Sequence, residues 1–170
     1  DTAVSIFILV WIGLFGSFAA MISRYVAGRI MDRRGYPGTV LIPFQITAAI
    51  GVALMAVILF MQLPAWTMLI AALFYGAGFG GVQNEALTLL FYRLPRHTTS
   101  EASAVWNIGF DGGTGLGSAV YGMLVTQMAF APVFGIASGV IAIGLAITLL
   151  DRQLGRHRVV EVNNLSARLK

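Results

Sequence analysis

Two acidic residues, Glu85 and Asp111, lie within otherwise apolar runs of the sequence. An ionisable group near the centre of a bilayer costs about 2.5–3.5 kcal/mol on insertion scales, so it often marks a functional site. Desolvation favours the neutral form of a carboxyl group, which would allow either residue to carry a proton. The alternative is a network of neutral acids and amides that only holds helices together.

Amide side chains accompany these acids. Asn107 and Asp111 are four residues apart, so they share one face of a helix. Asn84 or Glu85 would face them from the preceding helix across a polar cavity, and no lysine or arginine is expected at the same depth. The candidate proton and substrate residues are Asp111, Glu85, Asn107, Asn84 and Gln83.

Glycine pairs with a spacing of four residues occur beside both acids, as Gly76 and Gly80 and as Gly113 and Gly117. This spacing lets the backbones of two membrane helices approach closely. We interpret these glycines as packing positions. Bending of the backbone during a conformational cycle is compatible with that role.

The elements that must position these residues are apolar helices. Of the 170 residues, 58% are hydrophobic and 11% are charged, and the mean hydropathy is +0.83. About 20 apolar residues span the hydrocarbon core as a helix. We predict an all-α, polytopic membrane protein with five transmembrane helices, in a bundle over 1–150 and followed by a basic tail over 151–170. The helices are predicted at about 3–24, 38–61, 66–92, 100–127 and 131–150.

The basic residues indicate the topology of this bundle. They fall in three clusters, at 24–34, 93–96 and 152–170, which five crossings place on one side of the membrane. The positive-inside rule then predicts a cell-membrane protein with its basic loops and C-terminus in the cytoplasm. The positive charge therefore reports topology and gives no reason to expect a nucleic-acid partner.

Catalytic chemistry is not indicated. The chain has no cysteine and only two histidines, and we find no metal-ligand spacing, no phosphate-binding loop and no paired nucleophile and base. We expect no enzyme activity, no metal and no cofactor.

The end of the first predicted helix carries a recognisable pattern. Following Arg24, the residues Gly28, Asp32, Arg33 and Gly35 resemble the cytoplasmic loop signature of the major facilitator superfamily, Gly-x-x-x-Asp-Arg-x-Gly. Tyr36 departs from its fullest form, which continues with basic residues. The glycine-rich runs at 78–83 and 110–118 look like the C-terminal half of drug:proton antiporters and siderophore exporters.

The resemblance implies helices eight to twelve of a twelve-helix transporter, hence a partial bundle whose N-terminal half is missing. It also implies that Arg24, Gly28, Asp32, Arg33 and Gly35 form a cytoplasmic gate, for which a plain positive-inside anchor is the alternative. The expected function is secondary active transport, with proton-coupled export of small molecules by alternating access. The expected partners are the lipid bilayer, protons, a small-molecule substrate and the N-terminal half. A non-transporting helical module, such as an assembly or sensor subunit, remains the alternative.

Overall fold

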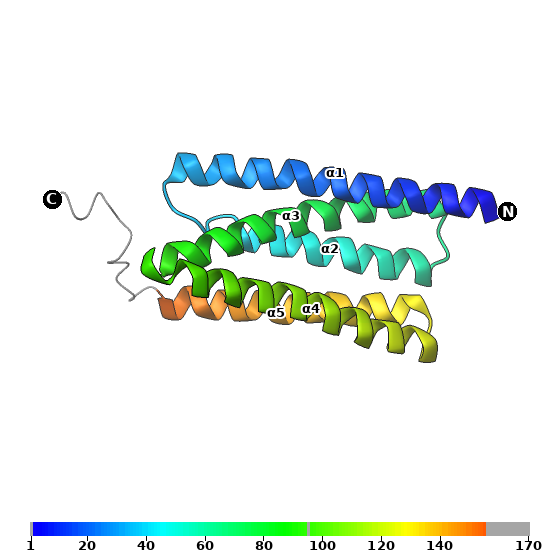
Figure 1. The fold of residues 1–170 in the computed structure, drawn as a ribbon. Helices are drawn as coiled ribbons and strands as arrows, with labels where there is room; N and C mark the ends of the chain where they lie inside the picture. Colours follow the sequence, from blue (N-terminus) through cyan, green and yellow to red (C-terminus); the bar gives the residue numbers. More distant parts are fainter. Residues whose placement is uncertain (1, 95, 156–170) are drawn as a thin grey trace.

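A computed structural model describes residues 2–94 and 96–155 (Figure 1). The prediction of an all-helical chain with five long helices is confirmed, and no strand occurs in the described part. The helices are α1 (Thr2–Arg34), α2 (Leu41–Phe60), α3 (Met68–Arg93), α4 (Thr99–Gln127) and α5 (Phe130–Leu154), and short 3₁₀ turns precede α3 and α4.

Four of the helices are both long enough and apolar enough to cross a membrane, namely α1, α2, α3 and α5. The helix α4 has 29 residues and meets the length requirement alone. Its mean hydropathy is lowered by six glycines and by polar residues such as Asn107 and Asp111.

Two helices continue beyond their predicted ends. The helix α1 ends at Arg34 and not near residue 24, because arginines at the end of an apolar helix do not interrupt its backbone hydrogen bonds. The expected loop signature thus begins on a helix, and the chain turns only at Gly35, whose φ is +77°. The helix α5 continues to Leu154, so the predicted tail begins later than 151. Residues 156–170 lie outside the described part.

The helix α3 lies at the centre of the arrangement. It packs along α1 on one side and along α2 on the other, and α5 packs against α2. Successive helices run in opposite directions, so the start of α1 and the end of α5 lie at opposite ends of the bundle (Figure 1).

Glycines allow both of these contacts with α3. A Cβ atom on Gly76 would overlap the carbonyl oxygen of Gly16 in α1, and one on Gly80 would overlap that of Ala20. On the other face, a Cβ atom on Gly78 would overlap the backbone of Ala48 in α2. Backbone cannot move aside as a side chain can, so these positions fix how closely α1 and α2 approach α3.

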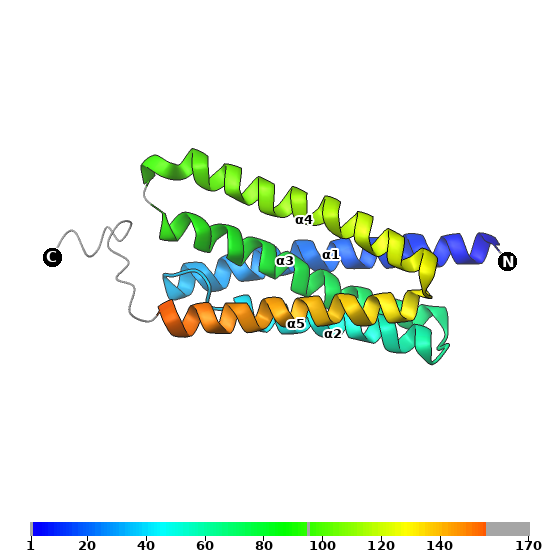
Figure 2. The same cartoon turned by 90° about the horizontal axis from the view of Figure 1, so that it is seen from below.

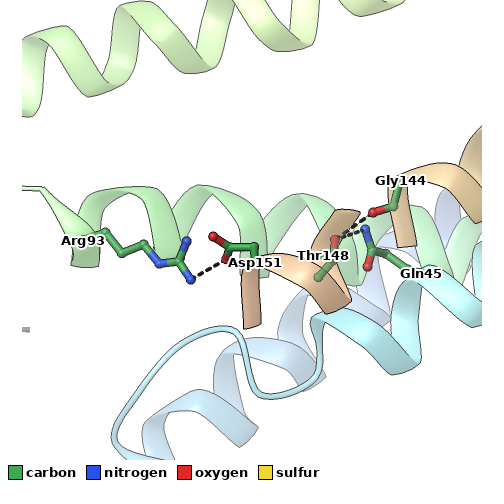
Figure 3. A network of polar contacts seen from close by, with 5 residues as sticks. All are labelled: Gln45, Arg93, Gly144, Thr148 and Asp151. Carbon is green, nitrogen blue, oxygen red and sulfur yellow. Dashed lines mark hydrogen bonds and ion pairs between the residues drawn. The ribbon is translucent and has the colours of Figure 1, made fainter. Parts of the chain in front are cut away.

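Polar contacts join α5 to its neighbours (Figure 3). The Nε2 atom of Gln45 on α2 donates a hydrogen bond of 2.9 Å to the Thr148 hydroxyl group. The Ser138 hydroxyl donates a hydrogen bond of 3.2 Å to the carbonyl oxygen of Ala49. At the end of α3, Arg93 forms an ion pair of 2.7 Å with Asp151. These contacts hold α5 in register with α2 and α3.

The helix α4 is loosely attached to the others. It meets α5 near their connection and diverges from it toward the beginning of α4 (Figure 2). A Cβ atom on Gly113 would have no atom within 4 Å, and one on Gly117 would contact only the ring of Tyr121 on the same helix. Within the described part, this second glycine pair therefore packs against no other helix, unlike Gly76 and Gly80.

Candidate functional site

A polar pair joins α1 to α3. The Nη2 atom of Arg24 donates a hydrogen bond to Oε1 of Gln83. Because α1 continues to Arg34, Arg24 lies ten residues, or about 15 Å, before its end. The expectation that no lysine or arginine lies at the depth of these residues is wrong for Gln83, because a guanidinium group contacts its side chain directly.

The start of α2 shows where this pair lies along the bundle. The carboxylate of Glu85 contacts Gly38, in the connection just before α2. Gln83 is two residues before Glu85 and lies about 3 Å further into the bundle. The Arg24–Gln83 pair thus lies near the level at which α2 begins.

A groove of about 570 Å³ runs from Arg24 along the seam between α1 and α3. Ile12 and Ser17 of α1 line one wall, and Tyr75 and Phe79 of α3 line the other. Ile12 is twelve residues from Arg24, so the groove extends for about 18 Å. It has a cation at the end nearer the basic clusters, and its lining is mainly apolar.

A second groove, of about 340 Å³, lies between α3 and α4. Phe79 and Gln83 line it from α3, and Trp106 and Phe110 line it from α4. Phe79 therefore belongs to both grooves, and Gln83 contacts the cation of the first. The two grooves form one surface, which we call the α1–α3–α4 face.

Four aromatic rings cross this face. The centroids of Tyr75 and Phe79 are 5.8 Å apart, those of Phe79 and Phe110 6.3 Å, and those of Phe110 and Trp106 5.8 Å. The first and last pairs are stacked, which is a favoured arrangement of aromatic side chains. Sequence reasoning did not identify Phe79, because a phenylalanine in an apolar helix normally indicates packing.

Glu85 has a different environment. Its side chain is 1% exposed, and Oε2 accepts a hydrogen bond of 2.6 Å from the backbone N–H of Gly38. The backbone amides of Thr39 and Val40 also interact with this carboxylate. These N–H groups belong to the connection between α1 and α2, which ends where α2 begins at Leu41. Glu85 thus holds this connection from the side of α3.

The polar residues of α4 do not meet Glu85. Asn107 and Asp111 are exposed, and neither lines the groove between α3 and α4. Trp106 and Phe110 face α3 instead, and each following residue is turned by about 100° around the helix. The expectation that Asn84 or Glu85 faces Asn107 and Asp111 across a cavity is therefore wrong.

Some buried polar atoms next to this site have no hydrogen-bond partner in the described part of the chain. They are Nδ2 of Asn84 and Oε1 of Glu85. Buried polar atoms are usually paired, so these two mark positions where a proton, a water molecule or another side chain would be favourable.

The signature residues lie at the basic end of α1. Gly28 is partly exposed, and Asp32, Arg33 and Gly35 are exposed. Arg24 lies apart from these residues, and its side chain contacts Gln83 on α3. Among the residues that the structure describes, Asp32 forms no ion pair.

Within residues 2–94 and 96–155, no group of three or more His, Asp or Glu side chains is arranged to hold a metal ion. Comparison with protein-family models, curated proteins and solved structures gives no match to this chain.

Proposed function

We propose that the chain forms five transmembrane helices of a secondary active transporter, a proton-coupled exporter of small molecules. The observation that carries the proposal is the α1–α3–α4 face, where Arg24 and Gln83 join two apolar grooves lined by aromatic side chains. Binding sites for small molecules are mostly apolar, with a few polar groups that fix orientation. The resemblance of Gly28, Asp32, Arg33 and Gly35 to the major facilitator signature supports the same class.

The exposed polar side of α4 supports the proposal that another part of the transporter covers this face. Asn107 and Asp111 are exposed on a helix whose neighbours are apolar enough to span a membrane. Polar side chains at such positions normally face other helices or a water-filled cavity, because contact with lipid is costly. We propose that the N-terminal half of the transporter covers this side across an aqueous cavity, and that Asp111 carries the exchanged proton.

We propose that the protein lies in the cell membrane with the basic ends of α1, α3 and α5 in the cytoplasm. These ends carry Arg33, Arg34, Arg93 and Arg152. Cytoplasmic loops of membrane proteins carry an excess of lysine and arginine, which supports this orientation. The exposed signature at the end of α1 would then be available for contact with the other half as the transporter rocks.

A flux experiment tests the function. The full-length protein is reconstituted into vesicles with an imposed pH gradient, and an internal pH-sensitive dye reports proton movement when a probe is added. The probes are ethidium, a lipophilic cation, and pyrenebutyrate, an aromatic carboxylate. We expect at least one probe to cause proton exchange in the wild type, and Asp111→Asn to abolish it at unchanged protein abundance. Absence of exchange with both probes would contradict the proposal.

Glu85 favours the alternative of a non-transporting membrane module. Its carboxylate holds the connection just before α2, so one of the two candidate acids has a structural role that requires no transport. The packing of Gly76 and Gly80 also requires none. The same flux experiment separates the two functions, because a purely structural module gives no proton exchange with either probe.

A further inference from the structure

We propose that the groove between α1 and α3 binds an amphipathic organic anion, with its acidic group on Arg24 and its aromatic body along Tyr75 and Phe79. The inference deepens the proposed function, on which it rests for taking this groove as the substrate site. It names the substrate class, a drug-sized aromatic carboxylate.

The charge of the groove favours an anionic ligand. Arg24 is the sole basic side chain among the residues that line it, and no acidic side chain lines it. In the described part of the chain, Arg24 forms no ion pair and donates a hydrogen bond to the neutral amide of Gln83. A guanidinium group has five N–H donors in a planar fork that matches a carboxylate. An anion can therefore bind here without displacing a resident carboxylate.

The order of polar and apolar side chains along the groove favours an amphipathic ligand. Arg24 lies at one end, Ser17 lies along the α1 wall, and Ile12 lies at the far end. The α3 wall offers the stacked rings of Tyr75 and Phe79. A ligand that is charged at one end and aromatic along its body matches this order, whereas a cation or an evenly polar molecule does not.

The size of the groove fits a drug-sized ligand. A volume of about 570 Å³ falls within the range of roughly 300–1,000 Å³ typical of sites for drug-sized ligands. The groove is walled by helices on both sides, and Met55 of α2 contributes to its lining. The proposed occupant is a free organic anion. An anionic lipid head group is the alternative source of the same charge, and the titrations below distinguish the two.

Three probes with one ring system test the charge preference. Pyrenebutyrate, pyrenebutanol and pyrenebutylamine differ only at the end group, and their binding to the full-length protein in phosphatidylcholine nanodiscs is measured by fluorescence. We expect Arg24→Gln to weaken pyrenebutyrate binding by about tenfold or more, because charge-assisted hydrogen bonds are lost. Binding of pyrenebutanol to the same variant should change by less than about twofold, which shows that the groove is intact.

Two further variants complete the design. Arg24→Lys should retain most of the pyrenebutyrate affinity. Arg152→Gln removes an equal charge from the exposed end of α5 and should have no effect. Equal losses with all three probes in Arg24→Gln, or an equal loss in Arg152→Gln, would overturn the proposal.

The lipid source is tested by repeating the titrations in nanodiscs that contain phosphatidylglycerol. If a lipid phosphate occupies Arg24, the difference between wild type and Arg24→Gln should disappear, and the proposal is overturned. If the difference persists, a free anion is supported. Failure of this inference is distinguishable from failure of the proposed function. Wild-type protein that exchanges protons with ethidium but binds pyrenebutyrate no more tightly than pyrenebutanol would keep the transporter function and reject only the anion site.

Discussion

Glu85 on α3 accepts a hydrogen bond of 2.6 Å from the backbone N–H of Gly38, 47 positions earlier in the chain. This contact places a fully buried side chain of the central helix against the connection just before α2. The φ of Gly38 is +86°, a conformation that glycine adopts readily and that directs its N–H toward the carboxylate. The connection between α1 and α2 is therefore held from the side by α3.

Replacing Glu85 by alanine should destabilise the protein. The variant leaves the partly buried N–H of Gly38 without its acceptor, and a donor left unsatisfied on burial costs about 1–3 kcal/mol. We expect a lower thermal unfolding midpoint in detergent. Glu101→Ala is the control, because Glu101 is exposed in the first turn of α4 and should contribute less than about 1 kcal/mol. Equal shifts in the two variants would contradict the role of Glu85 in holding this connection.

Gly76→Ala should separate α1 from α3. The added methyl group meets the carbonyl group of Gly16, and relief of such overpacking costs about 1–3 kcal/mol. Gly139→Ala on α5 is the matched control, since a Cβ atom there has no atom within 4 Å. The fraction of protein that remains folded and monodisperse after mild heating should fall in the first variant alone. A similar loss in both would show that the effect is not steric.

The polar side of α4 should be accessible to water. The sequence contains no cysteine, so a single introduced cysteine can be labelled selectively. Thr114→Cys should react with a charged, membrane-impermeant maleimide, because Thr114 lies on the exposed part of α4 together with Asp111. Ile143→Cys on α5 should not react in a bilayer, since it replaces a 62% exposed apolar side chain on an aliphatic helix. Equal labelling of the two, or no labelling of Thr114→Cys, would argue against an aqueous cavity.

The ion pair between Arg93 and Asp151 should contribute little to stability. The two side chains are 41% and 37% exposed, and pairs of this kind typically contribute about 0–1 kcal/mol. Arg93→Gln should therefore lower the unfolding midpoint only slightly. A loss greater than about 2 kcal/mol would show that the pair is buried in the intact protein.

The sequence was sufficient to predict the five helices and their order. Four of them, α1, α2, α3 and α5, require only a long apolar run. The sequence did not predict the end of α1, since Arg24 was interpreted as the limit of the apolar segment. Helical backbone hydrogen bonds continue through charged residues where the membrane ends, and α1 is ten residues longer as a result.

The candidate site was predicted less well than the fold. Both acids were identified, but which side of a helix a residue faces depends on how the helices pack. The close contacts of Gly76 with α1 and of Gly78 with α2 fix the rotation of α3, and this rotation turns Glu85 toward Gly38. Hydropathy contains no information on that rotation, so neither the Glu85–Gly38 contact nor the Arg24–Gln83 contact could be derived from it.

The glycine contacts of α3 also limit which sequences can adopt this fold. At Gly76, Gly78 and Gly80, a first side-chain atom would overlap the backbone of a neighbouring helix. Every amino acid except glycine is thus excluded or costly there. On α5, Gly135 and Gly139 have no such neighbours in the described part, so evolutionary drift is free to replace them. Mutational tolerance should therefore differ sharply between two helices of similar length in the same bundle.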